Sequence, residues 1–187
     1  MIDLKDCTFI IPIKIESDDR KRNLQITLNY LQRNFDTNII VYESDKISRA
    51  KKYIEDVSED ILYMFEKNET GIFHRTRMLN EMTEIAKTNI IVNYDIDVIF
   101  SPQQLVATKN AISINKMDLC FPYSGAFHDV PDIYFDDVKK DSLEKIDLNK
   151  CPLLNAQSVG GAFFFNKERY KEAGYENENF VSWGYED

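Results

Sequence analysis

The sequence predicts an α/β fold in which helices flank a mostly parallel central sheet. Strand-like and helix-like segments alternate along the chain of 187 residues, a length that suits one domain. The run TFIIPI at residues 8–13 is almost continuously apolar, as expected for a strand that is covered on both faces. A hydrophobic fraction of 43% supplies enough apolar side chains to bury such a sheet.

The first third of the chain alternates strand and helix patterns. After the strand at residues 8–13, three leucines at helical spacing follow a serine and an aspartate that suit an N-cap, which predicts a helix over residues 18–31. The sequence NIIVY predicts a second strand at residues 38–42. The charged residues 43–60 predict a loop with a short helix, and residues 61–65 predict a third strand.

The middle of the chain continues this alternation. Apolar side chains at helical spacing predict a helix over residues 73–86, and a strand follows at residues 89–94. A serine followed by a proline predicts the start of a helix over residues 101–114. Residues 119–122 then predict a short strand.

The last part of the chain is less regular. Residues 123–157 are rich in acidic side chains and show little periodicity, so we expect a loop-rich insertion near the functional site. An apolar run predicts a buried strand at residues 159–165. Residues 167–173 predict a short helix that ends at Gly174.

The charge balance and the cysteine content narrow the class of protein. Acidic residues outnumber basic ones by 32 to 23, so broad nucleic-acid binding, which needs a basic face, is not expected. The first residues predict a strand and not a signal peptide, and no segment has the roughly 20 apolar residues that span a bilayer. The three cysteines lack metal-ligand spacing and are expected to be reduced, as is usual in the cytoplasm.

Two carboxylates stand one residue apart at the end of a predicted strand, in the sequence VNYDIDVIF. Alternation along a strand places Asp95 and Asp97 on the same face. They could form a solvated strand end, a pair of carboxylates that share a proton, or a site for a divalent cation that bridges to substrate phosphates. Ligands of open α/β sheets bind beside the carboxyl ends of the strands, which favours the cation site.

Several other phosphate-handling motifs are missing. With only six glycines, the chain has no G-x-G-x-x-G sequence after its first strand, and it also lacks the P-loop pattern. A phosphatase of the dehalogenase type would need an aspartate directly after the first strand, where this chain has Pro12, Ile13 and Lys14. We therefore exclude these classes.

Three further segments contain residue types that suit nucleotides and sugars. In GIFHRTRMLNEM, Phe73 can stack on a base, and the forked donors of Arg75 suit phosphate oxygens. In SVGGAFFF, Gly160 and Gly161 let a ligand approach the backbone. In NFVSWGYED, the indole of Trp183 can pack on a sugar ring beside carboxylates that accept a hydroxyl proton. Each segment alone also fits an ordinary role: a core phenylalanine, a β-bulge and a packed turn.

Taken in order, FHRTRMLN, YDIDVIF, VGGAFFF and VSWGYED resemble the motifs of β-1,4-galactosyltransferases and related bacterial polysaccharide glycosyltransferases, and IIPIK resembles the family's first strand. The resemblance covers nearly the whole chain and implies a single domain, residues 1–187, with the GT-A fold of nucleotide-diphospho-sugar transferases. It also implies inverting transfer of a hexose or N-acetylhexosamine from a UDP-sugar to a saccharide or glycoconjugate acceptor, in the synthesis of capsule or other surface polysaccharides.

The resemblance further implies roles for residues on the donor side. Phe73 would stack near the uracil, and Arg75 would contact the diphosphate. Asp97, with Asp95 nearby, would hold Mn²⁺ or Mg²⁺ against that diphosphate. Further substrate-binding residues would be Pro12, Lys14, Gly160 and Gly161.

On the acceptor side, the resemblance assigns roles to the end of the chain. Trp183 and Gly184 would shape the donor and acceptor pocket, Glu186 would bind acceptor hydroxyls, and Asp187 would be the general base. Ser158 stands where galactose-specific relatives carry a bulky tyrosine. We therefore expect room for an N-acetylated donor sugar beside this serine.

The chain departs from the family pattern at two places. Ile13 and Lys14 replace a Phe-Arg pair, so this part of the nucleotide pocket is expected to differ. The family's downstream histidine, which completes its metal site, has no counterpart before Asp187, so we expect a domain truncated at its C-terminus with weak activity. Two other classes stay open: a non-catalytic module that binds nucleotide sugars or carbohydrates, and a metal-dependent phosphohydrolase or nucleotidyltransferase that uses the same aspartates.

Overall fold

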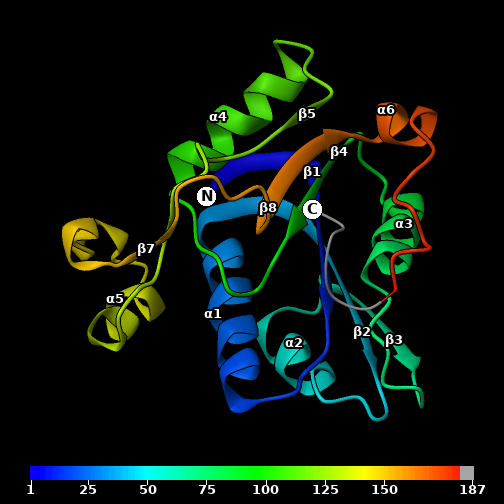
Figure 1. Cartoon of the computed structure of the whole chain (residues 1–187), viewed down its shortest axis with the longest axis horizontal. Coiled ribbons are helices and arrows are strands. Elements are labelled where there is room, and N and C mark those ends of the chain that lie inside the picture. The colour runs from blue at the N-terminus through cyan, green and yellow to red at the C-terminus, as the bar shows by residue number, and fades with distance from the viewer. Residues whose placement is uncertain (182–187) are drawn as a thin grey trace.

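The computed structural model describes residues 1–181 of the chain. The strands of its main sheet are β1 (Ile2–Ile13), β2 (Phe35–Asp45), β3 (Leu62–Lys67), β4 (Ile90–Tyr94), β5 (Leu119–Cys120) and β8 (Ala162–Asn166). They lie in the order β3-β2-β1-β4-β8-β5 (Figure 1). The first four are parallel to one another, whereas β8 runs antiparallel to both β4 and β5. The predicted, mostly parallel sheet is therefore confirmed.

Helices cover both faces of this sheet (Figure 1). They are α1 (Asp18–Asn34), α2 (Lys51–Val57), α3 (Arg75–Ile85), α4 (Pro102–Ser113) and α6 (Lys167–Glu172). Apolar side chains of α1, α2 and α4 share one buried cluster with Phe9 and Ile11 of β1, and those of α3 share a second cluster with Ile10. Because β1 is packed on both faces, its apolar run is explained.

The segment between β5 and β8 forms an arm beside α1 (Figure 1). It contains β6 (Phe127–His128), α5 (Phe135–Lys139) and β7 (Leu153–Asn155), with short 3₁₀ turns between them, and β6 and β7 pair antiparallel. The guanidinium of Arg22 on α1 lies 4.5 Å from the ring centre of Phe135. The expected loop-rich insertion is therefore confirmed, and it also contains a short helix and a strand pair.

Two strands of the sheet begin earlier than the sequence-based expectation. β1 begins at Ile2 instead of residue 8, and β2 begins at Phe35 instead of residue 38. These two extensions pair with each other, Ile2 opposite Phe35 and Leu4 opposite Thr37, before an irregularity in register. The charged side chains between Ile2 and Thr8 hide this pairing in the sequence, because they face solvent and break the apolar pattern.

Candidate functional site

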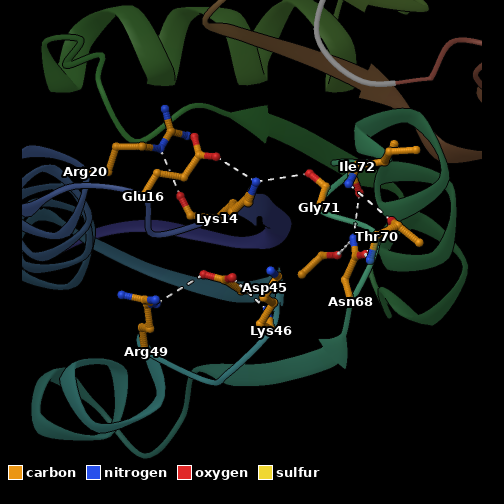
Figure 2. Close-up of polar contacts among 11 residues, drawn as sticks. Lys14, Glu16, Arg20, Asp45, Lys46, Arg49, Asn68, Thr70, Gly71 and Ile72 are labelled. Atoms are coloured by element: carbon orange, nitrogen blue, oxygen red, sulfur yellow. Dashed lines mark hydrogen bonds and ion pairs between the residues drawn. The ribbon is translucent and has the colours of Figure 1, made fainter.

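The candidate site lies where the parallel strands β1, β2, β3 and β4 end. Parallel strands have their carboxyl ends at one edge of a sheet, which is where open α/β folds bind ligands. We call this edge, made by residues 12–20, 43–49, 66–75 and 95–98, the rim. Figure 2 shows polar side chains from the first three of these segments pointing toward one another.

Asp95 follows β4 directly and is anchored from two sides. Its carboxylate Oδ1 lies 3.0 Å from Nη2 of Arg75, whose side chain is only 5% exposed at the start of α3. Its backbone N–H donates to the carbonyl of Gly161 at 2.8 Å. The structure thus brings together three residues that the sequence places in three separate motifs.

Asp97 lies two residues further on, and its residue surface is exposed. Partial desolvation of the carboxyl is the largest cause that raises the pKa of Asp97, and the negative charge of Asp95 is the second. The positive charges of Arg20 and Arg75 oppose this shift. A divalent cation would relieve the repulsion between the two carboxylates. Two oxygen donors beside open solvent fit an Mg²⁺-like or Mn²⁺-like ion that also takes substrate phosphate oxygens, because such ions usually bind through one or two carboxylates.

No group of three or more histidine, cysteine or carboxylate side chains within residues 1–181 could hold a metal by itself. Any ion at Asp95 and Asp97 would therefore need ligands from a substrate, from water or from beyond these residues.

Two buried hydroxyls of α1 hold the loop that carries the aspartates. Oγ1 of Thr27 donates to the carbonyl of Ile96 at 2.9 Å, and the hydroxyl of Tyr30 donates to the carbonyl of Phe100 at 2.5 Å. Both side chains are at most 2% exposed. The geometry of the loop is thus set by the helix that follows β1, as well as by β4.

We expect Tyr30→Phe to lower the free energy of unfolding by about 1–3 kcal/mol, because it leaves a buried carbonyl without its donor. Urea denaturation of the variant and the parent measures the difference. Tyr53→Phe is the control, because the hydroxyl of Tyr53 on α2 makes no hydrogen bond with other described residues. Its ring, which the variant keeps, lies 4.3 Å from Nζ of Lys21 on α1. Equal losses in the two variants would contradict the role assigned to the Tyr30 hydroxyl.

The glycine pair, Gly160 and Gly161, packs against residues 95–100, which we call the aspartate loop. Gly161 has a φ of +85°, and a Cβ built there would lie 3.0 Å from Cγ1 of Val98. The neighbouring Gly160 carbonyl accepts a hydrogen bond from the Tyr123 hydroxyl, which also lies 3.3 Å from Oγ of Ser158. The predicted segments YDID and SVGG are therefore in direct contact, and Gly161 is required by both backbone conformation and space.

The first strand contributes one charged side chain to the rim. Nζ of Lys14 lies 2.7 Å from Glu16 and donates to the carbonyl of Gly71 at 3.1 Å, so it joins the ends of β1 and β3 (Figure 2). Pro12 is buried inside β1. Phe73 is 2% exposed and packs in the α3-side core cluster. Stacking of Phe73 on a base stays a prediction.

Three polar residues of the rim were missed by the sequence reasoning. Arg20 donates from Nε to the carbonyl of Lys14 at 3.0 Å and lies close enough to Asp97 to affect its pKa. Asp45 ends β2, is 8% exposed, and lies 3.4 Å from Nε of Arg49 (Figure 2). Glu43 is fully buried and accepts from the backbone N–H groups of Arg49 and Ala50, just before α2. The sequence did hold one signal for these three residues: each lies at or after the end of a predicted strand, where α/β sheets bind ligands.

Four of the predicted residues, Trp183, Gly184, Glu186 and Asp187, lie outside the described residues. The last described residues before them contact α3, where Oγ1 of Thr76 donates to the carbonyl of Phe180 at 3.3 Å. Their predicted roles at the donor and acceptor pocket therefore stay predictions.

Known proteins resemble this chain in structure more clearly than in sequence. No family model and no curated protein sequence matches it. The mannosyltransferase PcManGT from Pyrobaculum calidifontis, in complex with GDP-Man and Mn²⁺, matches with a TM-score of 0.60 at 13% identity, over 93% of this chain and 48% of that one. TarS 1-349 from S. aureus matches with a TM-score of 0.56 at 14% identity, over 94% and 51%.

A third similar structure is glucosyl-3-phosphoglycerate synthase from M. tuberculosis, with a TM-score of 0.51, 10% identity and coverage of 88% of this chain and 58% of that one. At such low identity the likeness shows the fold alone. The chain has the GT-A fold that the resemblance implied. It spans about half the length of the solved structures that it matches.

Proposed function

We propose that this chain is the nucleotide-sugar-binding part of a metal-dependent, inverting glycosyltransferase. The observation that carries the proposal is the contact between the aspartate loop, the glycine pair and Arg75 at the rim, in a chain with the GT-A fold. Support also comes from PcManGT and the synthase, whose structures hold GDP-Man with Mn²⁺ and UDP, respectively.

In this proposal Asp95 and Asp97 would hold the ion. A bound Mn²⁺ or Mg²⁺ supplies positive charge that neutralises the diphosphate as it leaves the donor sugar. Arg75, already 3.0 Å from Asp95, fixes the orientation of that carboxylate and places a second positive charge beside it. Lys14, which is paired with Glu16, places a further ammonium group at the end of β1.

The acceptor chemistry belongs to the end of the chain. Asp187 would take the proton of the acceptor hydroxyl, which contributes roughly 10²–10⁴ in rate for a positioned general base. Glu186 would orient the acceptor, and Trp183 would cover the sugar. We further propose a UDP-hexose or UDP-N-acetylhexosamine donor, a saccharide acceptor of a surface polysaccharide such as capsule, and a cytoplasmic location. Among the described helices, none has the length and hydrophobicity that crossing a bilayer requires.

Calorimetric titration tests the proposed function. UDP, GDP, UDP-sugars and GDP-mannose are titrated into the protein with and without Mn²⁺. We expect one nucleoside diphosphate to bind in a Mn²⁺-dependent manner, and UDP-N-acetylhexosamine to bind at least as well as UDP-galactose, given the small side chain of Ser158. Binding without sugar transfer would favour a non-catalytic module, and release of phosphate or pyrophosphate would favour a phosphohydrolase or nucleotidyltransferase.

We expect Asp187→Asn to leave Mn²⁺-dependent binding of the nucleotide within about twofold while it lowers transfer by roughly 10²–10⁴, because the amide cannot accept the acceptor's proton. Calorimetry and a transfer assay on the same preparation measure the two effects. A parallel loss of nucleotide affinity would place Asp187 in the donor site and would contradict its role as the general base.

A further inference from the structure

The asparagine at the end of FHRTRMLN has no role in the proposed donor site, yet its amide is fully hydrogen-bonded. Asn80 lies on α3 and is 8% exposed. Its Nδ2 donates to the carbonyl of Glu176 at 3.1 Å and to Oε1 of Glu178 at 2.9 Å. Its Oδ1 accepts from the Tyr170 hydroxyl at 2.8 Å and from the Glu176 N–H at 3.0 Å. An asparagine amide has two donors and one oxygen with two lone pairs, so all four are used.

The same face of α3 makes two more contacts with residues 174–181, which we call the strap. One helical turn before the asparagine, Thr76 donates to the carbonyl of Phe180 at 3.3 Å. One turn after it, the carboxylate of Glu84 accepts from the Tyr175 hydroxyl. Residues four apart lie on one face of a helix, so a single face of α3 holds the strap along its length.

The turn after α6 directs the strap onto this face. Gly174 and Tyr175 both have positive φ, +94° and +66°, and their N–H groups donate to carbonyls of α6. The Tyr170 hydroxyl stays protonated as a donor, because burial raises its pKa well above the usual range. The strap is thus fixed by its backbone turn at one end and by Asn80 in the middle.

At its N-terminal end, α3 contacts the candidate cation site. Arg75 pairs with Asp95, so one helix bonds both to the first carboxylate of that site and to the strap. The strap runs directly into the residues that include Glu186 and Asp187. A rigid helix between two parts of a site can set their spacing more precisely than a loop can.

We propose that Asn80 is a positioning residue that clamps the strap to α3 and so sets the spacing between the strap and Arg75 at the donor site. The effect of Asn80 on catalysis rests on the proposed function. The clamp, by which we mean the four hydrogen bonds of the Asn80 amide, does not depend on it. An alanine at this position would remove all four of these hydrogen bonds.

Hydrogen exchange tests the clamp independently of activity. In Asn80→Ala, we expect amide exchange in the strap to accelerate at least about tenfold, since its local opening costs less free energy. Exchange in residues 90–100 should not change. Asn110→Ala is the matched control, because Asn110 lies on α4 and its side chain makes no hydrogen bond with other described residues. Unchanged exchange in the strap of Asn80→Ala would overturn the proposal.

Steady-state kinetics with the donor found by calorimetry test the positioning role. We expect Asn80→Ala to lower kcat by about 10–100-fold with KM for the donor within about twofold, because a misplaced general base costs rate without weakening donor binding. Thr76→Val, which removes one hydroxyl from the same face, should give a smaller loss of the same kind. Equal kcat in Asn80→Ala and the parent would overturn the positioning role. A parent that binds no nucleotide would contradict the proposed function. Hydrogen exchange in the strap would still show whether Asn80 holds the strap on α3.

Discussion

Asp97→Ala is expected to weaken Mn²⁺-dependent nucleotide binding at least about 100-fold, because it removes one of the two carboxylates proposed to hold the ion. The fold should persist, since the Asp97 residue surface is exposed and the loop is held elsewhere, at Ile96 and Phe100. Partial desolvation, and after it the negative charge of Asp95, raises the pKa of the Asp97 carboxyl, so the charged form gains no stability from its surroundings. Removing the carboxylate should therefore leave the free energy of unfolding unchanged or slightly higher.

The measurement is calorimetry with UDP and GDP, with and without Mn²⁺, together with urea denaturation. Asp56→Ala is the control, because Asp56 is an exposed carboxylate on α2, outside the segments that form the rim. It changes the net charge by the same amount and so separates a local ligand effect from long-range electrostatics. Nucleotide affinity equal to that of the parent in Asp97→Ala would remove Asp97 from the site.

The fold could be predicted from the sequence because its main signals are local. The apolar run of β1 and the leucines of α1 need no knowledge of distant partners to be recognised. The start of α4 was equally local, since Ser101 and Gln104 form a capping box. The starts of β1 and β2 were not predictable in this way, because Ile2 and Phe35 form strands only by pairing with each other.

In the candidate site too, residues with a local signal could be predicted and contacts between distant residues could not. Asp95 and Asp97 could be recognised because the strand pattern places them directly after β4. That Arg75 would be buried and paired with Asp95 could not be predicted, because the partners are twenty residues apart on different elements. The fully bonded amide of Asn80 could not be predicted either, because its partners come from the strap.

Gly161→Ala is expected to lower the free energy of unfolding by about 2–5 kcal/mol, from two additive causes. A positive φ at a residue with a Cβ costs about 1–2 kcal/mol. The new methyl would also lie 3.0 Å from the buried Val98 side chain, and such overpacking costs typically 1–3 kcal/mol. Movement of this backbone also displaces the carbonyl that accepts from Asp95, so nucleotide affinity should fall by about tenfold, the range seen when support for a metal ligand is lost.

Gly174→Ala separates the two causes. Gly174 also has a positive φ, +94°, but a Cβ there would meet no atom within 4 Å. It should cost about 1–2 kcal/mol from backbone strain alone and leave nucleotide affinity intact. The double variant Gly161→Ala/Val98→Ala removes the close contact but keeps the strain, so it should regain nucleotide affinity even if Val98→Ala lowers stability by itself. If affinity is lost equally in Gly161→Ala and Gly174→Ala, the glycine pair does not support the aspartate loop, and its close packing on Val98 serves stability only.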